Sequence, residues 1–296
     1  MPEPVRLAFA VVYLASPAAM PVVERHLEFV ERFAPPGVDW WIEAVAHRAN
    51  QAFRDRLAAM PRLRLHGPGS IPPVEEKWGS REHAHYLDAL VRHAVARGAT
   101  HLCTLDDDSF PARADWFEVV RARLEEGHAF VATFRAENGD RILPHPSFLA
   151  TTADFVARTG ARFLPEDDPD LLPFLAAHGQ TKDTGAGYAL AAQRAGRGWA
   201  RLPRSNAVND HDIMAGLYGD IAFHFGGANR IRTQTFRRQK RRLDALAPPE
   251  RRARLEAALA ENRRDHEALM ARVATDMDAY LAYLRGAGLD GRVQKP

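Results

Sequence analysis

Up to Asp108 the chain alternates between short apolar runs and longer stretches whose apolar residues recur at helical spacing. The run from Leu7 to Leu14 is typical of a strand buried on both faces, and Ser16-Pro17 ends it. We expect further strands at residues 39–46, 62–66 and 100–105, and helices at residues 21–33 and 80–96. This order predicts an α/β fold with a mostly parallel sheet that is covered by helices on both faces.

The second half of the sequence is less regular. We expect a helix at residues 115–126, strands at residues 129–133 and 187–192, and a helical turn or two at residues 213–218. After a strongly basic run from Arg230 to Arg242, Pro248-Pro249 opens a long amphipathic helix that extends to Gly286. The change in composition predicts a main domain over residues 1–230, followed by a basic segment and a helical extension over residues 231–296.

The composition argues against several classes of protein. The 296 residues carry 40 basic and 38 acidic side chains, so the protein lacks the large net positive charge that would attract polyanions to its whole surface. Cys103 is the one cysteine, which excludes a disulfide framework within the chain and argues against a cysteine zinc site. The N-terminus lacks the features of a signal peptide, and no window reaches the roughly 20 apolar residues of a membrane-spanning helix. We therefore expect a cytoplasmic protein, and peripheral association with the inner membrane face stays open.

Three consecutive carboxylates, Asp106 to Asp108, follow the strand expected at residues 100–105. Ligands gather at the carboxyl ends of such strands, and like charges this close disfavour full ionisation unless a cation lies among them. Mg²⁺ binds a few carboxylates and completes its shell with water or substrate phosphates. In an extended segment Asp106 and Asp108 point to the same side, so they form the better pair for a metal ion. The alternative is that these residues cap the turn that follows.

Three other features are compatible with a site at the same edge. His224 ends a strand-like run beside Gly226-Gly227, and its imidazole either completes a metal site, more readily for Mn²⁺ than for Mg²⁺, or is a core histidine. Asp210 precedes the helix expected at residues 213–218, where it either caps that helix or acts as a general base. Gly185 and Gly187 would let the backbone approach a ligand closely.

The order of these features resembles that of the GT-A fold glycosyltransferases, especially the inverting family 2, over residues 5–230. The matching motifs are Thr104-Leu105-Asp106-Asp107-Asp108, Asn209-Asp210-His211-Asp212 and His224-Phe225-Gly226-Gly227. The resemblance implies a GT-A-like catalytic domain that moves a sugar from a nucleotide-sugar donor to an acceptor hydroxyl by direct displacement at the anomeric carbon. The acceptor stays open between a glycan, a lipid-linked sugar and a small molecule.

The resemblance also implies roles for individual residues. It makes Asp106, Asp108 and His224 ligands of Mn²⁺ or Mg²⁺. It makes Asp210 the catalytic base, although the family usually has a Glu-Asp pair where this chain has Asn209-Asp210. The implied donor-binding residues are Ala15, Ser16, Arg81, Asp106, Asp107, Gly185 and Gly187.

Alternative functions stay open on the sequence alone. A nucleotidyltransferase of related architecture would carry a Gly-rich, basic loop after the first strand, where this chain has residues 15–19, Ala-Ser-Pro-Ala-Ala. A phosphatase of the haloacid dehalogenase type would place its Asp-x-Asp at the first strand. A glycosyltransferase-like binding protein without activity is a third alternative.

The C-terminal region offers possible contacts with partners. Apart from Phe236, no aromatic residue interrupts the basic run, so we do not expect nucleic acid as a partner. The long helix would either pack on its own domain or form a homodimer, and association with a membrane surface stays open.

Overall fold

The computed structural model describes residues 4–74, 79–228 and 248–287. Its main sheet has seven strands in the order β3-β2-β1-β4-β7-β6-β8. The strands are β1 (Arg6–Val12), β2 (Asp39–Val45), β3 (Leu63–His66), β4 (His101–Asp106), β6 (Phe130–Phe134), β7 (His145–Thr152) and β8 (Ala200–Pro203). Neighbouring strands are parallel except at β7, which runs antiparallel to both β4 and β6.

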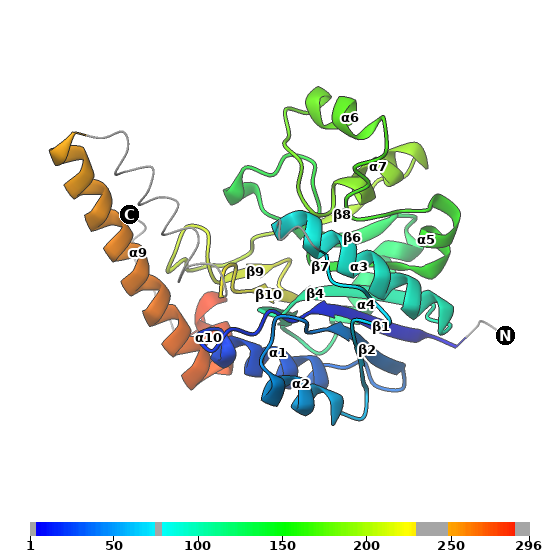
Figure 1. Ribbon diagram of the computed structural model, residues 1–296, viewed down its shortest axis with the longest axis horizontal. Coiled ribbons are helices and arrows are strands. Elements are labelled where there is room, and N and C mark those ends of the chain that lie inside the picture. Colours follow the sequence, from blue (N-terminus) through cyan, green and yellow to red (C-terminus); the bar gives the residue numbers. More distant parts are fainter. Residues whose placement is uncertain (1–3, 75–78, 229–247, 288–296) are drawn as a thin grey trace.

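Helices cover both faces of this sheet (Figure 1). Side chains of β1 alternate between them: Leu7, Phe9 and Val11 enter one buried cluster and Ala8, Ala10 and Val12 the other. The first cluster contains residues of α1 (Met20–Arg32), α2 (Gln51–Ala58) and α4 (Trp116–Glu125). The second contains residues of α3 (Gly79–Ala96), α5 (Ala153–Thr159) and α7 (Ala186–Arg194). The α/β fold class predicted from the sequence, a mostly parallel sheet flanked by helices, is confirmed.

A second, three-stranded antiparallel sheet begins where β4 ends. It has the order β5-β10-β9, with β5 (Ser109–Pro111), β9 (Gly216–Tyr218) and β10 (Ala222–His224). The helical turns expected at residues 213–218 are therefore wrong. Asn206 holds this segment extended, because its amide donates to the Ala215 carbonyl at 3.0 Å and accepts from the Leu217 N–H at 2.6 Å.

The strand expected at residues 187–192 is also wrong, since these residues belong to α7. Gly185, with φ +101°, lies directly before this helix, and every residue from Ala186 to Ala192 is buried. A short apolar run does not distinguish a buried strand from a buried helix. The short helix α6 (Leu171–Ala177) packs on α7 in a third apolar cluster, and a 3₁₀ turn (Ala136–Asn138) follows β6.

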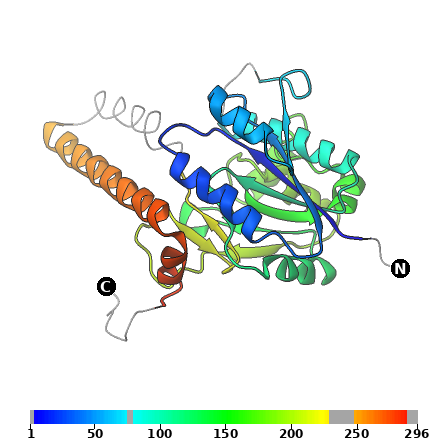
Figure 2. The same ribbon diagram turned by 90° about the horizontal axis from the view of Figure 1, so that it is seen from below.

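The C-terminal helix is divided in two, α9 (Pro249–Thr275) and α10 (Met277–Leu284). At the break, the Asp276 side chain caps α10 by accepting the Ala279 N–H at 2.9 Å. In Figures 1 and 2, α9 reaches out from the body with its C-terminal end beside α1 and α10. Arg25 of α1 donates to the Ala274 carbonyl at 2.6 Å. The helical extension is thus confirmed, and its last turns pack on the chain's own domain.

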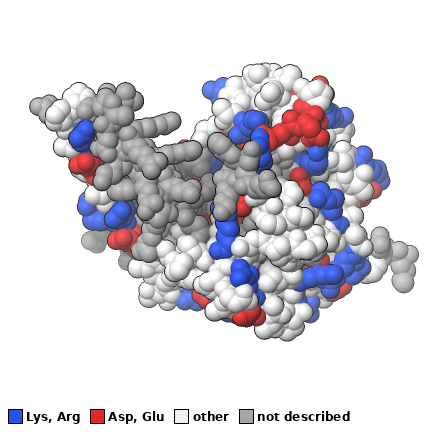
Figure 3. All heavy atoms as spheres, in the orientation of Figure 1, with Lys and Arg blue, Asp and Glu red and all other residues white. Residues whose placement is uncertain are grey.

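Two other predictions cannot be compared with the structure. The basic run at residues 230–242 and the domain boundary at residue 230 lie outside the described residues. On the face drawn in Figure 3, basic and acidic side chains are interspersed. No helix in the described part of the chain is both long enough and apolar enough to cross a bilayer.

Candidate functional site

Segments from both sheets meet at the carboxyl edge of the main sheet. The pairing of β10 with β5 places His224 opposite Ser109, directly beside the three aspartates. Because β7 runs antiparallel, it is its first residue, His145, that lies at the edge where the parallel strands end. The structure therefore brings Asp106, Asp108 and His224 together, as the sequence predicts, and adds His145, which sequence reasoning missed.

His224 lies between two carboxylates. Its Nε2 is 3.4 Å from Asp106 Oδ2 and 3.3 Å from Asp108 Oδ1. Burial by itself lowers the pKa of His224, but the negative charges of Asp108 and Asp106 outweigh it and raise the pKa to about 9. Burial likewise opposes ionisation of Asp106 and Asp108, but contact with His224 holds the pKa of each below its usual range. The two carboxylates thus create a negative potential at this edge, which stabilises positive charge there.

Asp106, His145 and His224 have the geometry of a metal site. One potential ligand atom from each lies within 4.8 Å of the other two, and the two imidazole rings stack with centroids 5.2 Å apart. Asp106 Oδ1 is buried and accepts no hydrogen bond from the described residues, with His83 Nε2 3.5 Å away. A buried carboxylate oxygen without a donor is costly unless a cation occupies the space beside it. The residues therefore fit a divalent cation, and two imidazoles favour Mn²⁺ over Mg²⁺.

Asp108 also organises the loop that follows β10. Its Oδ2 accepts the backbone N–H groups of Gly227 at 3.0 Å and Ala228 at 3.1 Å, and its own carbonyl accepts the Phe225 N–H at 2.9 Å. The carboxylate therefore faces this loop with one oxygen and His224 with the other. Sequence reasoning identified its proximity to His224 and missed its contacts with the loop.

Asp107 points away from this pair, toward the loop after β1. Its Oδ2 accepts the N–H groups of Leu14 at 2.8 Å and Ala15 at 3.0 Å. Burial, together with the charge of Asp108, raises the pKa of Asp107 to about 7. The loop that carries Ala15 and Ser16, two predicted donor-binding residues, is thus fastened to the triple aspartate.

A buried hydrogen-bond network of Tyr13, His26 and Ser109 holds the turn that carries the aspartates. Nδ1 of His26 donates to the Ser109 carbonyl, and its Nε2 accepts from the Tyr13 hydroxyl at 3.0 Å. Burial lowers the pKa of His26 to about 4, so this imidazole is neutral and its two nitrogens keep these opposite roles. The Ser109 hydroxyl in turn accepts the Asp106 N–H at 2.9 Å. These contacts fix the turn that presents Asp106 and Asp108.

The remaining predicted donor-binding residues already have partners within the chain. Arg81, in the first turn of α3, forms an ion pair with Glu166. A Cβ at Gly185 would lie 2.2 Å from the Pro144 carbonyl oxygen, and one at Gly187 would lie 2.1 Å from that of Arg162. Close packing against backbone therefore explains both glycines without a ligand.

Asp210, the predicted base, contacts the C-terminal helices. Arg272 of α9 donates to its Oδ2, and the Tyr283 hydroxyl of α10 donates to its Oδ1 at 2.9 Å. Asp210 precedes an extended segment, so it caps no helix at residues 213–218. Its described contacts join it to α9 and α10, and no described contact joins it to Asp106 or His224.

Comparison with known proteins gives matches among solved structures. No family model matches the chain, and no curated protein matches it by sequence. The mannosyltransferase PcManGT from Pyrobaculum calidifontis, in complex with GDP-Man and Mn²⁺, matches with a TM-score of 0.46 and 17% identity over 96% of this chain and 82% of that one. Residues 1–349 of S. aureus TarS, in complex with UDP-GlcNAc, match with a TM-score of 0.37 and 8% identity over 54% of this chain.

These similarities concern the arrangement of the chain and assign no role to any residue. The match spans about half of the TarS chain, 48%.

Proposed function

We propose that this protein is a metal-dependent glycosyltransferase that transfers a sugar from a nucleotide-sugar donor to an acceptor hydroxyl. The observation that carries the proposal is the convergence of Asp106, His145 and His224 around a buried carboxylate oxygen that accepts no hydrogen bond from the described residues. This cluster lies at the carboxyl edge of an α/β sheet, where phosphate-bearing ligands bind.

Asp106, His145 and His224 would hold the cation, and Asp108 Oδ1, 3.3 Å from His224 Nε2, is available as a further ligand. When bound, a divalent cation neutralises negative charge that develops on a leaving diphosphate. The Asp108 contacts with Gly227 and Ala228 keep the loop after β10 in place beside this charge.

The donor would lie over the loop after β1, where Asp107 fixes Ala15 and so positions Ser16. Arg81, Gly185 and Gly187 complete the predicted donor site. The segment before Gly185 adjoins α3, because the Thr184 hydroxyl donates to the Ser80 carbonyl at 3.1 Å. Arg81 would bind a diphosphate by exchanging Glu166 for phosphate oxygens.

Calorimetric titration tests the donor site. UDP and GDP are titrated into the full chain with Mn²⁺ and with EDTA, followed by UDP-GlcNAc and GDP-Man as donors. We expect Mn²⁺-dependent binding of one nucleotide that Asp106→Asn abolishes. Asp55→Asn is the matched control, because Asp55 is an exposed aspartate of α2.

The reaction products separate the alternatives. A glycosyltransferase releases nucleoside diphosphate from the donor, whereas a nucleotidyltransferase makes or consumes pyrophosphate, and ³¹P NMR distinguishes the two. Inversion would appear in the ¹H spectrum as an anomeric configuration opposite to that of the donor. Nucleotide binding without turnover of any donor would favour a non-catalytic relative. No metal-dependent binding of any of the four ligands would overturn the proposal.

We further propose Asp210 as the base that deprotonates the acceptor, with its present partners Arg272 and Tyr283 released in the active state. Asp210→Asn should then lower turnover by about 100-fold or more while the donor Kd stays unchanged. Arg272→Ala is the paired variant, since it removes the ion pair and keeps the carboxylate. If Asp210→Asn keeps full turnover and both variants lower the Tm by the same amount, Asp210 is not the base, and its role is to hold the C-terminal helices on the domain.

A further inference from the structure

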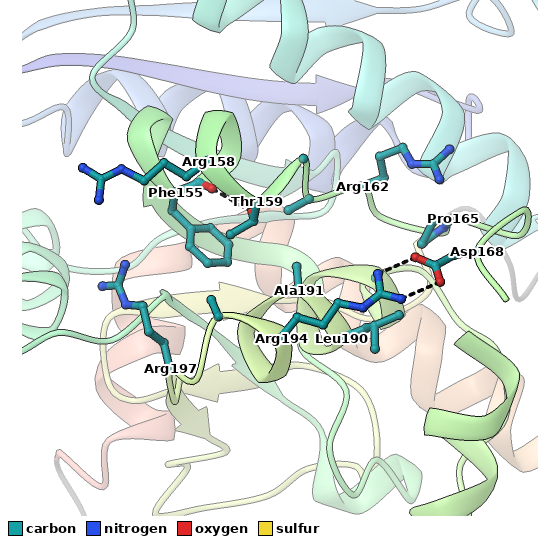
Figure 4. A pocket seen from close by; sticks show the side chains of 14 residues that line it. Phe155, Arg158, Thr159, Arg162, Pro165, Asp168, Leu190, Ala191, Arg194 and Arg197 are labelled. Atoms are coloured by element: carbon teal, nitrogen blue, oxygen red, sulfur yellow. Dashed lines mark hydrogen bonds and ion pairs between the residues drawn. The ribbon is translucent and has the colours of Figure 1, made fainter. Parts of the chain in front are cut away.

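A cavity of about 560 Å³ lies between the ends of α5 and α7 (Figure 4). Its volume is in the range of small-molecule sites. Because β7 begins at His145 and ends at Thr152, where α5 follows, the metal cluster and the α5 side of the cavity lie at opposite edges of the sheet. At the rise of a β-strand this length corresponds to roughly 20 Å. The end of the cavity beside Arg158 is therefore separate from the metal cluster, whereas Gly187, a predicted donor-binding residue, lines the other part of the cavity.

Arginines dominate the polar lining of the cavity. The lining includes Arg158, Arg162, Arg194 and Arg197, against one carboxylate, Asp168. Two of the arginines already pair with acidic side chains. Arg194 pairs with Asp168 at 2.6 Å and also with Asp170, and Arg162 pairs with Asp167 at 2.7 Å.

The charge of Arg197 is not neutralised within the described structure. This half-buried side chain donates to the carbonyls of Gly127 and His128, both at 2.8 Å, and no carboxylate of the described residues pairs with it. A half-buried cation without a counter-ion is unfavourable, and an anionic ligand would relieve that cost. Carbonyl contacts on one side of the guanidinium also hold it in a fixed orientation.

Arg158 is the second available cation. Its one described ion pair is with Asp154 at 2.7 Å, four residues earlier on α5, and 77% of the Arg158 side chain is exposed. Such a pair contributes only about 0.3–0.5 kcal/mol, so a better anion can displace it. In the view of Figure 4, the guanidinium groups of Arg158 and Arg197 lie on the same side of the Phe155 ring. The Arg197 guanidinium carbon is 5.8 Å from the centroid of that ring.

We propose that this cavity binds a ligand through a phosphate or pyrophosphate group held between Arg158 and Arg197. Arginine binds phosphate oxygens with paired, charge-assisted hydrogen bonds. Buried apolar side chains of Phe155, Leu190 and Ala191 line the rest of the cavity and would contact the remainder of the ligand. The group is either part of a soluble phosphorylated compound or a lipid headgroup. The inference does not depend on the proposed glycosyl transfer.

The first measurement is calorimetric titration of the full chain with pyrophosphate in EDTA, so that no metal ion occupies the other site. We expect saturable binding that Arg158→Ala and Arg197→Gln each weaken about tenfold. Arg201→Ala should bind like the wild type. Arg201 is the matched control because it packs over Phe134 and Trp199, outside the cavity, with no carboxylate partner among the described residues. Asp106→Asn should also bind like the wild type.

The second measurement distinguishes the source of the phosphate. Sedimentation with phosphatidylcholine vesicles, with and without phosphatidic acid, reports binding to a headgroup. Dependence on phosphatidic acid that Arg158→Ala removes and Arg201→Ala keeps would assign a lipid headgroup. Pyrophosphate binding without vesicle binding would assign a soluble ligand. Because Arg158 is exposed, its variant should fold even if Arg197→Gln does not. Binding to neither probe, or binding that Arg158→Ala leaves unchanged, would overturn the proposal.

Discussion

The carboxylate of Asp107 accepts the backbone N–H of Ala15 at 3.0 Å, which joins the carboxyl end of β4 to the loop after β1. The same oxygen accepts the Leu14 N–H, and Ala15 has a φ of +39°, a conformation that an L-residue rarely adopts unaided. One run of three aspartates therefore both supplies a candidate metal ligand and shapes the loop proposed to contact the donor.

Replacing Asp107 should separate these two contributions. In Asp107→Ala the loop loses its acceptor, so we expect nucleotide binding in Mn²⁺ to weaken about tenfold while Mn²⁺ binding in the absence of nucleotide persists. Titration calorimetry with Mn²⁺ alone, and then with nucleotide, measures both. Asp55→Ala is the control. A parallel loss of metal and nucleotide binding would place Asp107 in the metal site instead.

His145 and Asp108 are the two candidates for the third ligand of the proposed metal ion, beside Asp106 and His224. At a Mn²⁺ concentration of 100 Kd the wild type should gain about 2.7 kcal/mol of stability, and a tenfold loss of affinity would reduce this gain to about 1.4 kcal/mol. We expect His145→Gln to cause at least this loss. Asp108→Asn, which keeps an acceptor oxygen for Gly227, should lose less. Thermal melts with and without Mn²⁺ measure the gain. The reverse order would make Asp106, Asp108 and His224 the ligand set.

We expect Gly187 to contribute to the stability of the fold, whether or not it contacts a ligand. A Cβ there would lie 2.1 Å from the Arg162 carbonyl oxygen, so Gly187→Ala should lower the free energy of unfolding by about 1–3 kcal/mol. Gly198→Ala is the control, since the nearest atom to its Cβ would be 3.9 Å away. Urea denaturation measures both. A Gly187→Ala protein that keeps its stability and loses nucleotide binding would support the predicted donor contact.

Asp88 should make the protein less stable as the pH rises. Burial raises the pKa of Asp88 to about 7, although its carboxylate accepts the Phe163 N–H at 2.8 Å. Between the ordinary aspartate pKa and pH 7 the folded state keeps a proton that the unfolded state has released, so stability falls across this window. Asp88→Asn keeps an acceptor without the charge. It should exceed the wild type by about 1–3 kcal/mol at pH 8 and match it at pH 4. Equal differences at both pH values would contradict this assignment.

The sequence was sufficient to predict the N-terminal part of the fold except for α2, a helix that was not expected. The strands β1 to β4 and the helices α1 and α3 have strong apolar periodicity, and the structure has them within a few residues of the expected limits. The later segments depend on tertiary context. The run at residues 187–192 is apolar on every side because it is buried among α6 and the sheet, and the segment at residues 213–218 is extended because Asn206 holds it.

The site was predictable where a residue ends a strand that the sequence reveals. Asp106 and His224 each end a strand, and Asp108 lies in the turn directly after β4. His145 was not predictable, because it starts β7, an antiparallel strand that was not expected. The short continuous apolar run from Phe148 to Ala150 is the signal that could have revealed that buried strand, and with it a histidine at the same edge.

The packing of the last helices on the first has a consequence for how the chain is made. Val273 and Tyr280 belong to the same buried cluster as Phe9 and Val22, which leave the ribosome long before them. The part of this cluster that α9 and α10 cover must therefore remain exposed until those helices are made. Exposed apolar surface of this kind binds holdase chaperones and promotes aggregation. We expect yield in cells to depend on such chaperones more strongly than the stability of the finished protein would suggest.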